Sequence, residues 1–149
     1  MSDQSLILAC STCGAKNRVP LSRLDDTPKC GKCGLLLPLE NLSRPVIVTD
    51  HDFDREVMAS TLPVLVDCWA PWCGPCRSMG PVLDALAVKY RARLKIAKLN
   101  VDENSGIGSR YSISSVPTIL LVKNGRVIDK LIGALPKEQL ESQIARILG

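Results

Sequence analysis

Seven cysteines are the residues of this 149-residue chain whose type and spacing best suit chemistry. Four of them form two Cys-x2-Cys pairs near the N-terminus: Cys10, Cys13, Cys30 and Cys33. The other three lie near the middle of the chain: Cys68, Cys73 and Cys76. A thiolate is both a ligand for soft metals and the nucleophile of disulfide exchange. We therefore expect a metal centre in the first group and a redox pair in the second.

The first group has 16 residues between its two pairs, a spacing typical of a four-cysteine zinc site. A glycine follows each pair, Gly14 and Gly34, and can adopt the positive φ that turns backbone amides toward the sulfurs. Two disulfides are an alternative, but they need an oxidising compartment. An iron site is a second alternative, because a tetrahedral sulfur site suits both metals. We expect one zinc ion, which would contribute most of the folding free energy of so small a segment.

The redox pair belongs to Cys73-Gly74-Pro75-Cys76, which follows a predicted buried strand and begins a predicted helix. The unpaired amides and partial positive charge at the start of a helix stabilise a thiolate, so they lower the pKa of Cys73. Cys76 lies one helical turn further on, where it can displace a substrate bound to Cys73. The arrangement predicts two-electron exchange between a dithiol and a disulfide.

Two other residues with reactive side chains are expected to take no part in the chemistry. Cys68 could be a third redox thiol, but a lone cysteine in a buried strand is usually a small apolar filler. His51 is the only histidine. It falls in the first turn of a predicted helix, where a solvated side chain is expected, and four cysteines already complete a zinc site.

The chain beyond residue 45 alternates between strand and helix patterns. Apolar runs predict strands over residues 46–48, 63–70, 94–101, 118–122 and 127–132. Helices are predicted after an N-cap at Thr49-Asp50, over residues 74–92, over residues 104–111 and from Pro136 onward. Asn124-Gly125 predicts a tight hairpin turn. The order predicts an α/β fold, with a mixed central sheet flanked by helices on both faces.

The stretch 38–45 contains two prolines and separates two expected domains, a zinc-binding module with its linker over residues 1–45 and a second domain over residues 46–149. Lys and Arg outnumber Asp and Glu by only six to four in the first and thirteen to eleven in the second. So weak a basic balance predicts no nucleic-acid partner. No targeting segment and no apolar stretch of membrane-spanning length are visible, so we expect a cytoplasmic protein without a membrane partner.

Five motifs resemble those of the thioredoxin family. The run VDCWAPWCGPC, Val66–Cys76, resembles its active-site signature, and Lys98–Asp102 resembles its third strand. Val116–Thr118 resembles the loop of its cis-proline, Lys123–Gly125 its hairpin, and Gly133-Ala134 the small residues opposite the active site. With the N-terminal cysteines, the chain resembles the zinc-containing second type of bacterial thioredoxin. The resemblance implies a thioredoxin-like sheet and a small zinc-ribbon-like module.

The resemblance also implies roles for individual residues. Cys73 would be the nucleophile and Cys76 the resolving thiol. Asp67 would be a buried carboxylate that accepts the proton of Cys76 through water, with Lys98 nearby, and burial should raise the pKa of Asp67. Pro117 would follow a cis peptide bond. The flat surface that binds substrate would comprise Trp72, Gly74, Pro75, Ser115, Val116, Pro117, Gly133 and Ala134.

The activity implied by the resemblance is that of a monomeric protein-disulfide reductase in electron transport, with a zinc site that is structural or redox-regulatory. A flavin-containing thioredoxin reductase that uses NADPH would reduce the oxidised form. Neither NADPH nor flavin should bind this chain, because it has no dinucleotide-binding glycine motif. One alternative is a zinc-dependent redox-sensing chaperone or interaction module. Another is an oxidase or isomerase on the same fold.

Overall fold

The computed structural model describes residues 5–39 and 42–148. Its contacts divide the chain into two compact units, Met1–Asn41 and Leu42–Gly149, which we call the ribbon unit and the sheet unit. The division falls four residues before the boundary expected from the sequence. None of the described helices is long and apolar enough to cross a membrane.

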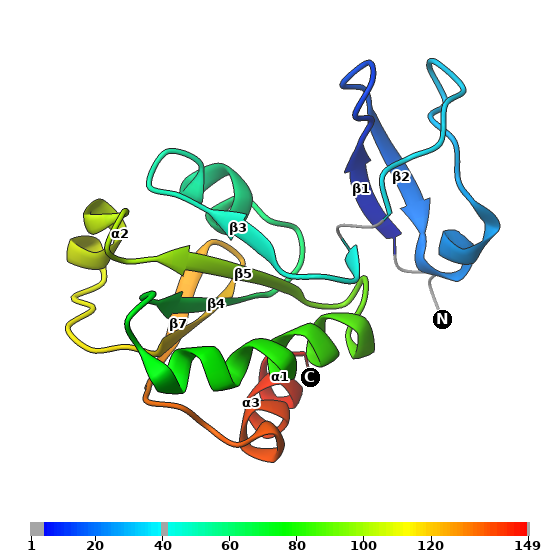
Figure 1. The fold of residues 1–149 in the computed structure, drawn as a ribbon. Coiled ribbons are helices and arrows are strands. Elements are labelled where there is room, and N and C mark those ends of the chain that lie inside the picture. The colour runs from blue at the N-terminus through cyan, green and yellow to red at the C-terminus, as the bar shows by residue number, and fades with distance from the viewer. Residues whose placement is uncertain (1–4, 40–41, 149) are drawn as a thin grey trace. The chain divides into compact units, whose positions relative to one another are not determined.

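The ribbon unit is built on an antiparallel pair of strands, β1 (Ser5–Ala9) and β2 (Lys16–Pro20), followed by a 3-10 helix, η1 (Leu21–Asp26) (Figure 1). The first cysteine pair lies in the connection between β1 and β2. A bridge between Lys29 and Leu36 encloses the second pair. The described buried side chains of this unit are few and small: Leu6, Cys10, Val19, Leu24, Cys30 and Leu37.

The sheet unit contains a five-stranded mixed sheet, in agreement with the expected fold class. Its strands are β3 (Val46–Val48), β4 (Val64–Trp69), β5 (Lys95–Asn100), β6 (Thr118–Lys123) and β7 (Arg126–Ile132). Their order across the sheet is β3-β5-β4-β6-β7. The pairs β3–β5 and β4–β5 are parallel, whereas β4–β6 and β6–β7 are antiparallel. The central strand β4 is therefore paired on both edges, and its residues are buried on both faces, as its continuous apolar sequence predicts.

Helices cover both faces of this sheet (Figure 1). Two of them, α1 (Gly74–Lys89) and α3 (Lys137–Leu148), pack with Leu65, Ile96 and Ile119 on one face. On the other face, Val66 and Leu99 pack with residues of α2 (Ser105–Arg110) and of η3 (Asp54–Met58). Successive strand residues point to opposite faces, so one strand contributes to both cores.

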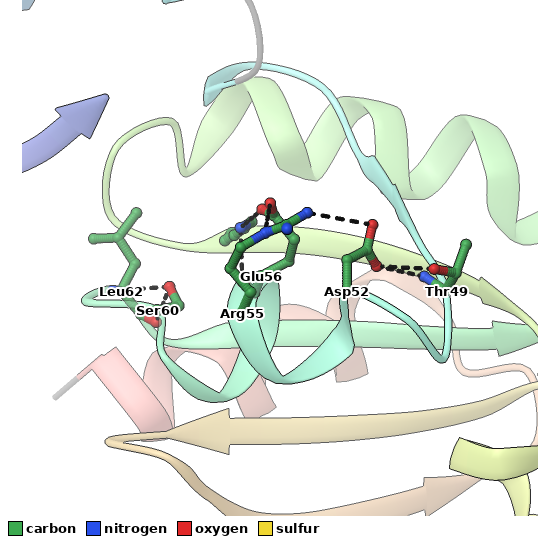
Figure 2. Close-up of polar contacts among 7 residues, drawn as sticks. Thr49, Asp52, Arg55, Glu56, Ser60 and Leu62 are labelled. Carbon is green, nitrogen blue, oxygen red and sulfur yellow. Dashed lines mark hydrogen bonds and ion pairs between the residues drawn. The ribbon is translucent and has the colours of Figure 1, made fainter. Parts of the chain in front are cut away.

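The first helical segment of the sheet unit differs from the expectation. The sequence predicts a helix capped by Thr49-Asp50, but η3 begins at Asp54 and is π-helical. Asp52 organises the turn before it (Figure 2), because its carboxylate accepts hydrogen bonds from the backbone and the hydroxyl of Thr49 at 2.7 and 3.3 Å. Arg55 lies between the carboxylates of Asp52 and Glu56.

Asp50 instead caps a helix that is distant in the sequence. Its two carboxylate oxygens accept hydrogen bonds from the backbone amides of Gly106 and Ile107, each at 2.8 Å. These amides belong to the first turn of α2, where they have no partner within the helix. The side chain of Asn104 in turn accepts the backbone amide of Asp50 at 2.8 Å. The contacts join the start of α2 to the end of β3.

The hairpin between β6 and β7 turns at Asn124-Gly125, as predicted. Both residues have positive φ, 54° and 74°, which is the requirement of a type I′ turn. The helix predicted over residues 74–92 ends earlier, at Lys89, and Ala92 beyond it has a φ of 66°. The chain can therefore reverse direction before β5.

Candidate active site and metal centre

The redox pair lies at the junction of β4 and α1. Cys73 and Cys76 form a disulfide, with their Cα atoms 5.3 Å apart. Cys73 is the N-cap residue of α1, and its sulfur accepts a hydrogen bond from the backbone amide of Cys76 at 3.2 Å. An amide directed at the Cys73 sulfur, together with the partial positive charge of a 16-residue helix, stabilises a thiolate at this position.

Arg77 is a residue of this site that the sequence analysis missed. It follows Cys76 in the first turn of α1, and its guanidinium donates a 2.7 Å hydrogen bond to the carbonyl of Pro71. The contact ties the loop before Cys73 to the helix after it. An Arg on a helix is usually solvated, so its identity alone carries no signal for this contact.

Asp67 and Lys98 lie side by side beneath this junction. They occupy paired positions on β4 and β5, and the alternation of β4 places Asp67 on the same face as Leu65, which packs against α1. Asp67 is 1% exposed, and burial raises its pKa to about 6, although the positive charge of Lys98 opposes the rise. The predicted direction is confirmed. Neither carboxylate oxygen has a hydrogen-bond partner among the described protein atoms.

The ammonium of Lys98 lies over an aromatic ring, 5.4 Å from the centre of the Trp69 ring. Trp69 in turn packs against the cluster formed by Ala70, Cys73 and Cys76. Trp69 is therefore part of the layer under the disulfide. Lys98 affects Asp67 through its charge, since no hydrogen bond joins the two among the described contacts.

The loop before β6 approaches the disulfide from the other side. The Val116–Pro117 peptide bond is cis, as the resemblance implied, and the carbonyl oxygen of Val116 lies 3.7 Å from the Cys73 sulfur. Two hydrogen bonds hold the loop. The buried Thr118 hydroxyl donates to the carbonyl of Ser115 at 2.7 Å, and the amide of Gly133 donates to the carbonyl of Pro117 at 2.9 Å. Thr118 was missed by the sequence analysis.

The residues expected to bind substrate are distributed around the disulfide. Val116 packs against the cysteines, Gly133 is bonded to Pro117, and Pro117 itself is buried. Trp72 is 70% exposed, and its indole N–H donates to Asp102 at 3.0 Å. Asp102 lies in a motif that the sequence analysis quoted without assigning it a role. The remaining expected residues are all exposed: Gly74, Pro75, Ser115 and Ala134.

The four N-terminal cysteines converge on one point. Their sulfur atoms all lie within 4.8 Å of one another, and the pairs Cys10–Cys33 and Cys13–Cys30 are each separated by 3.6 Å. Four ligands about 2.3 Å from a central zinc ion at tetrahedral angles lie about 3.8 Å apart. The sulfur positions therefore fit a tetrahedral zinc ion.

The backbone around these cysteines also suits a metal. Gly14 and Gly34 have φ of 76° and 81°, so each turn directs amides toward the first sulfur of its pair. Backbone hydrogen bonds from Cys13 and Thr12 lower the pKa of Cys10. Those from Cys33 and Lys32, together with the side chain of Asn17, lower the pKa of Cys30 to about 6. These bonds favour the thiolate of the first cysteine in each pair, which is the form that binds metal. Against the backbone hydrogen bonds from Ala15 and Leu35, burial and the neighbouring thiols raise the pKa of the second cysteines, Cys13 and Cys33.

Comparisons with known proteins agree with both sites. Residues 44–146 match the family model described as thioredoxin, and residues 9–35 match the model described as thioredoxin 2, N-terminal. The chain belongs to the thioredoxin family. It is 48% identical to thioredoxin of Porphyra purpurea over 101 residues, which are 68% of this chain and 94% of that one. Thioredoxin 1 of Nostoc sp. is 45% identical over 107 residues, 72% of this chain and all of that one, and thioredoxin of Haemophilus influenzae is 46% identical over 103 residues, 69% and 96%.

The sheet unit is thus a thioredoxin domain, and the ribbon unit matches the N-terminal module of a thioredoxin with a zinc ribbon. The chain is a protein-disulfide reductase that works by thiol–disulfide exchange. The similar thioredoxins align over about the length of the thioredoxin domain, so the ribbon unit is an addition to it.

The two residues expected to be inert occupy inert environments. Cys68 is fully buried and packs with Val66 and Leu99 on the sheet face opposite α1. Burial, followed by the charge of Asp67, raises the pKa of Cys68 to about 12, which disfavours its thiolate. His51 is exposed and does not belong to the cysteine cluster.

Proposed function

We propose that Cys73 attacks the disulfides of substrate proteins and that Cys76 resolves the product. The Cys73 thiolate attacks one sulfur of the substrate disulfide, forms a mixed disulfide and releases the other sulfur as a thiolate. Cys76 then attacks Cys73, which closes the Cys73–Cys76 disulfide and releases the second substrate thiol. The observation that carries this proposal is the position of Cys73 as the N-cap of α1, with the Cys76 amide directed at its sulfur.

Asp67 has the role of proton acceptor in this proposal. Its pKa of about 6 leaves it mostly ionised at pH 7 yet close enough in basicity to take a proton. It lies on the sheet face beneath α1, and a water molecule between its carboxylate and Cys76 would carry the proton. Lys98 moderates the pKa of Asp67 by its charge.

Substrate binding is assigned to the surface around Trp72 and the cis-proline loop. An extended substrate segment can pair with the backbone of Val116, next to the Cys73 sulfur. The exposed Trp72 ring supplies apolar area, and Gly74, Pro75 and Ala134 leave room for a chain to approach. Ser115, Pro117 and Gly133 shape the loop that presents Val116.

The N-terminal cysteines hold one zinc ion in this proposal. Sulfur separations of 3.6 Å and turns with positive φ support it. Bound zinc would cross-link the two turns of a unit with a very small core.

A redox-regulatory role would add the release of zinc on oxidation. Peroxide would take two electrons from a pair of these thiolates, which become a disulfide as peroxide is reduced to water, and metal would be released. A zinc-sensitive dye tests this; metal retained at doses that fully oxidise Cys73 and Cys76 would contradict a regulatory role.

The partners in this proposal are protein disulfides and a flavin-containing thioredoxin reductase that draws electrons from NADPH. We infer that the protein works as a monomer in the cytoplasm, where the five cysteines outside the Cys73–Cys76 pair stay reduced. The electrons pass through the Cys73–Cys76 disulfide, so neither NADPH nor flavin needs a site on this chain.

A trapping experiment tests the order of attack. Cys76→Ser removes the resolving thiol, so its Cys73 thiolate should form a lasting mixed disulfide with insulin whose own disulfides are intact. Non-reducing electrophoresis shows this species and mass spectrometry locates the bond. Cys73→Ser is the matched control and should trap little. A mixed disulfide formed mainly by Cys73→Ser through Cys76 would reverse the assignment. Equal protection of unfolding proteins by wild type and Cys73→Ser, without insulin reduction by either, would favour a chaperone.

A further inference from the structure

Asn17 is the described side chain that connects the two cysteine turns of the ribbon unit. It lies on β2 and is half-buried. Its side-chain amide nitrogen donates to the carbonyl of Ala15 at 3.1 Å and lies 3.5 Å from the Cys30 sulfur, to which it also donates. Its side-chain oxygen accepts the backbone amide of Gly31 at 2.9 Å. One residue thereby links a segment beside the first turn to the inside of the second.

The two turns are otherwise alike. In the first, Cys10 donates its amide to Ala15 and accepts the amide of Gly14, each at 2.9 Å. In the second, the amide of Cys30 bonds to Leu35 at 2.8 Å, and Gly34 donates to Cys30 at 2.9 Å. Because the hydrogen bonds repeat, each residue after Cys10 can be compared with the residue at the same distance after Cys30.

The repetition breaks at Asn17. Asn17 follows Cys10 by seven residues, and the residue that follows Cys30 by seven is the buried, apolar Leu37. Only one half of the repeat therefore carries an amide side chain at this position. That side chain contacts the opposite half, through Gly31 and Cys30.

We infer that Asn17 is a positioning residue of the metal centre: it holds the Cys30 sulfur and the second turn in ligating geometry and so slows the loss of a bound metal ion. The inference rests on the metal site proposed above. Its physical basis is that hydrogen bonds to ligand atoms fix the direction of the ligand and reduce the freedom that dissociation requires. The Asn17 bonds also join segments 14 residues apart, so they restrain the separation of the two turns.

The experiment compares zinc release from the full-length protein loaded with one zinc ion per chain. A coloured chelator in excess takes up the metal, and the rate of colour development is measured for wild type, Asn17→Ala, Asn17→Asp and Arg18→Ala. Arg18 is the matched control, because it is the next residue on β2 and is exposed, and its side chain donates only to the Ser5 hydroxyl among the described hydrogen bonds.

Removing the amide in Asn17→Ala should raise the release rate about 10- to 100-fold. Arg18→Ala should stay within about twofold of wild type. Asn17→Asp keeps an oxygen for the Gly31 amide but loses both donated bonds and places a carboxylate beside a thiolate, so it should release metal at least as fast as Asn17→Ala. Asn17→Asp at the wild-type rate would overturn the role of the bond to the Cys30 sulfur.

The absorption spectrum of the cobalt(II)-loaded protein distinguishes loss of the Asn17 hydrogen bond from a general loss of stability of the unit. A hydrogen bond to a thiolate lowers the energy of its donor electrons, so loss of the Asn17 bond should shift the thiolate-to-cobalt charge-transfer band to longer wavelength in Asn17→Ala and not in Arg18→Ala. If Asn17→Ala binds no cobalt(II) while Arg18→Ala binds one ion per chain, the loss is confined to the residue that holds the Cys30 sulfur and supports the inference.

Failure of the inference and failure of the metal site give different results. Wild type that holds no zinc overturns the metal site and the inference with it. Wild type that holds one zinc, with an Asn17→Ala release rate and cobalt spectrum like its own, overturns the inference alone. Insulin reduction should be equal in all four proteins, because Asn17 lies outside the thioredoxin domain.

Discussion

Both units of this protein carry Cys-x2-Cys pairs, yet the surrounding backbone directs their sulfurs to different chemistry. In the ribbon unit, Gly14 and Gly34 end each pair in a tight turn with positive φ, and two pairs converge within 4.8 Å. In the thioredoxin domain, Cys76 continues into the 16-residue helix α1. Its pair forms a disulfide. The backbone after the second cysteine thus differs between the two sites: a glycine with positive φ in the ribbon unit and a continuing helix in the thioredoxin domain.

The two units also differ in what stabilises them. The thioredoxin domain has apolar clusters on both faces of a five-stranded sheet. The ribbon unit has six described buried apolar or cysteine side chains, of which two are Cys10 and Cys30. A unit with so little apolar area to bury depends on its cross-links, whereas the domain does not. The following predictions test whether the two units are independent in function and stability.

The largest expected effect separates the two cysteine sites by function. Cys73→Ser should abolish insulin reduction, because Cys73 is the N-cap of α1 and no other described cysteine caps a helix. Its zinc content should remain that of wild type. Turbidity from insulin precipitation and elemental mass spectrometry measure the two quantities. Residual activity carried by the ribbon cysteines would show that they form a second redox relay.

The reciprocal change is Cys10→Ser/Cys13→Ser. It should remove the zinc and the protection of the β1–β2 amides from hydrogen exchange, since serine does not replace a thiolate ligand and the unit has little core. Insulin reduction should stay within about twofold of wild type. Loss of activity together with zinc would show that the ribbon unit supports turnover.

Asp67→Asn should stabilise the thioredoxin domain against unfolding and should lower its turnover rate. An unfolded Asp ionises near its usual pKa of 3.8, whereas burial raises the pKa of Asp67 to about 6, so the folded domain retains its proton longer and loses stability as pH rises between these values. The difference corresponds to about 3 kcal/mol above pH 6. Asn removes that cost, and turnover should fall about 10- to 100-fold because the proton acceptor is lost.

Urea unfolding followed by tryptophan fluorescence measures this stability, since both tryptophans belong to the thioredoxin domain. The gain of Asp67→Asn over wild type should be present at pH 7 and absent below about pH 4. An equal gain at both pH values would mean that it comes from packing rather than from charge.

The smallest expected effect concerns the cap on α2. Asp50→Ala removes acceptors for the amides of Gly106 and Ile107, so it should lower the unfolding free energy of the domain by about 1–2 kcal/mol. Arg146→Ala is the matched control; it breaks an exposed ion pair with Asp129 and should cost less than about 0.5 kcal/mol. Equal losses of unfolding free energy in the two variants would contradict a capping role for Asp50.

Much of this architecture follows from local sequence patterns. The apolar run before Cys73 predicts β4, the Asn-Gly pair predicts the hairpin at residues 124–125, and the spacing of the four N-terminal cysteines predicts their cluster. Each of these signals acts between residues close in the chain or through one residue type of unusual chemistry. Such signals predict structure from the sequence, because any other local conformation of the same residues would have a higher free energy.

The sequence by itself determined the order of the elements and the position of both cysteine sites. Only the tertiary structure decided that Asp50 caps a helix more than fifty residues away, that Asn17 joins the two cysteine turns, and that Cys68 faces away from the redox pair. Asp, Asn and Cys form such contacts in many surroundings, so their type does not specify a partner. The partner is chosen when packing brings two distant segments within hydrogen-bonding distance, and that depends on the whole fold.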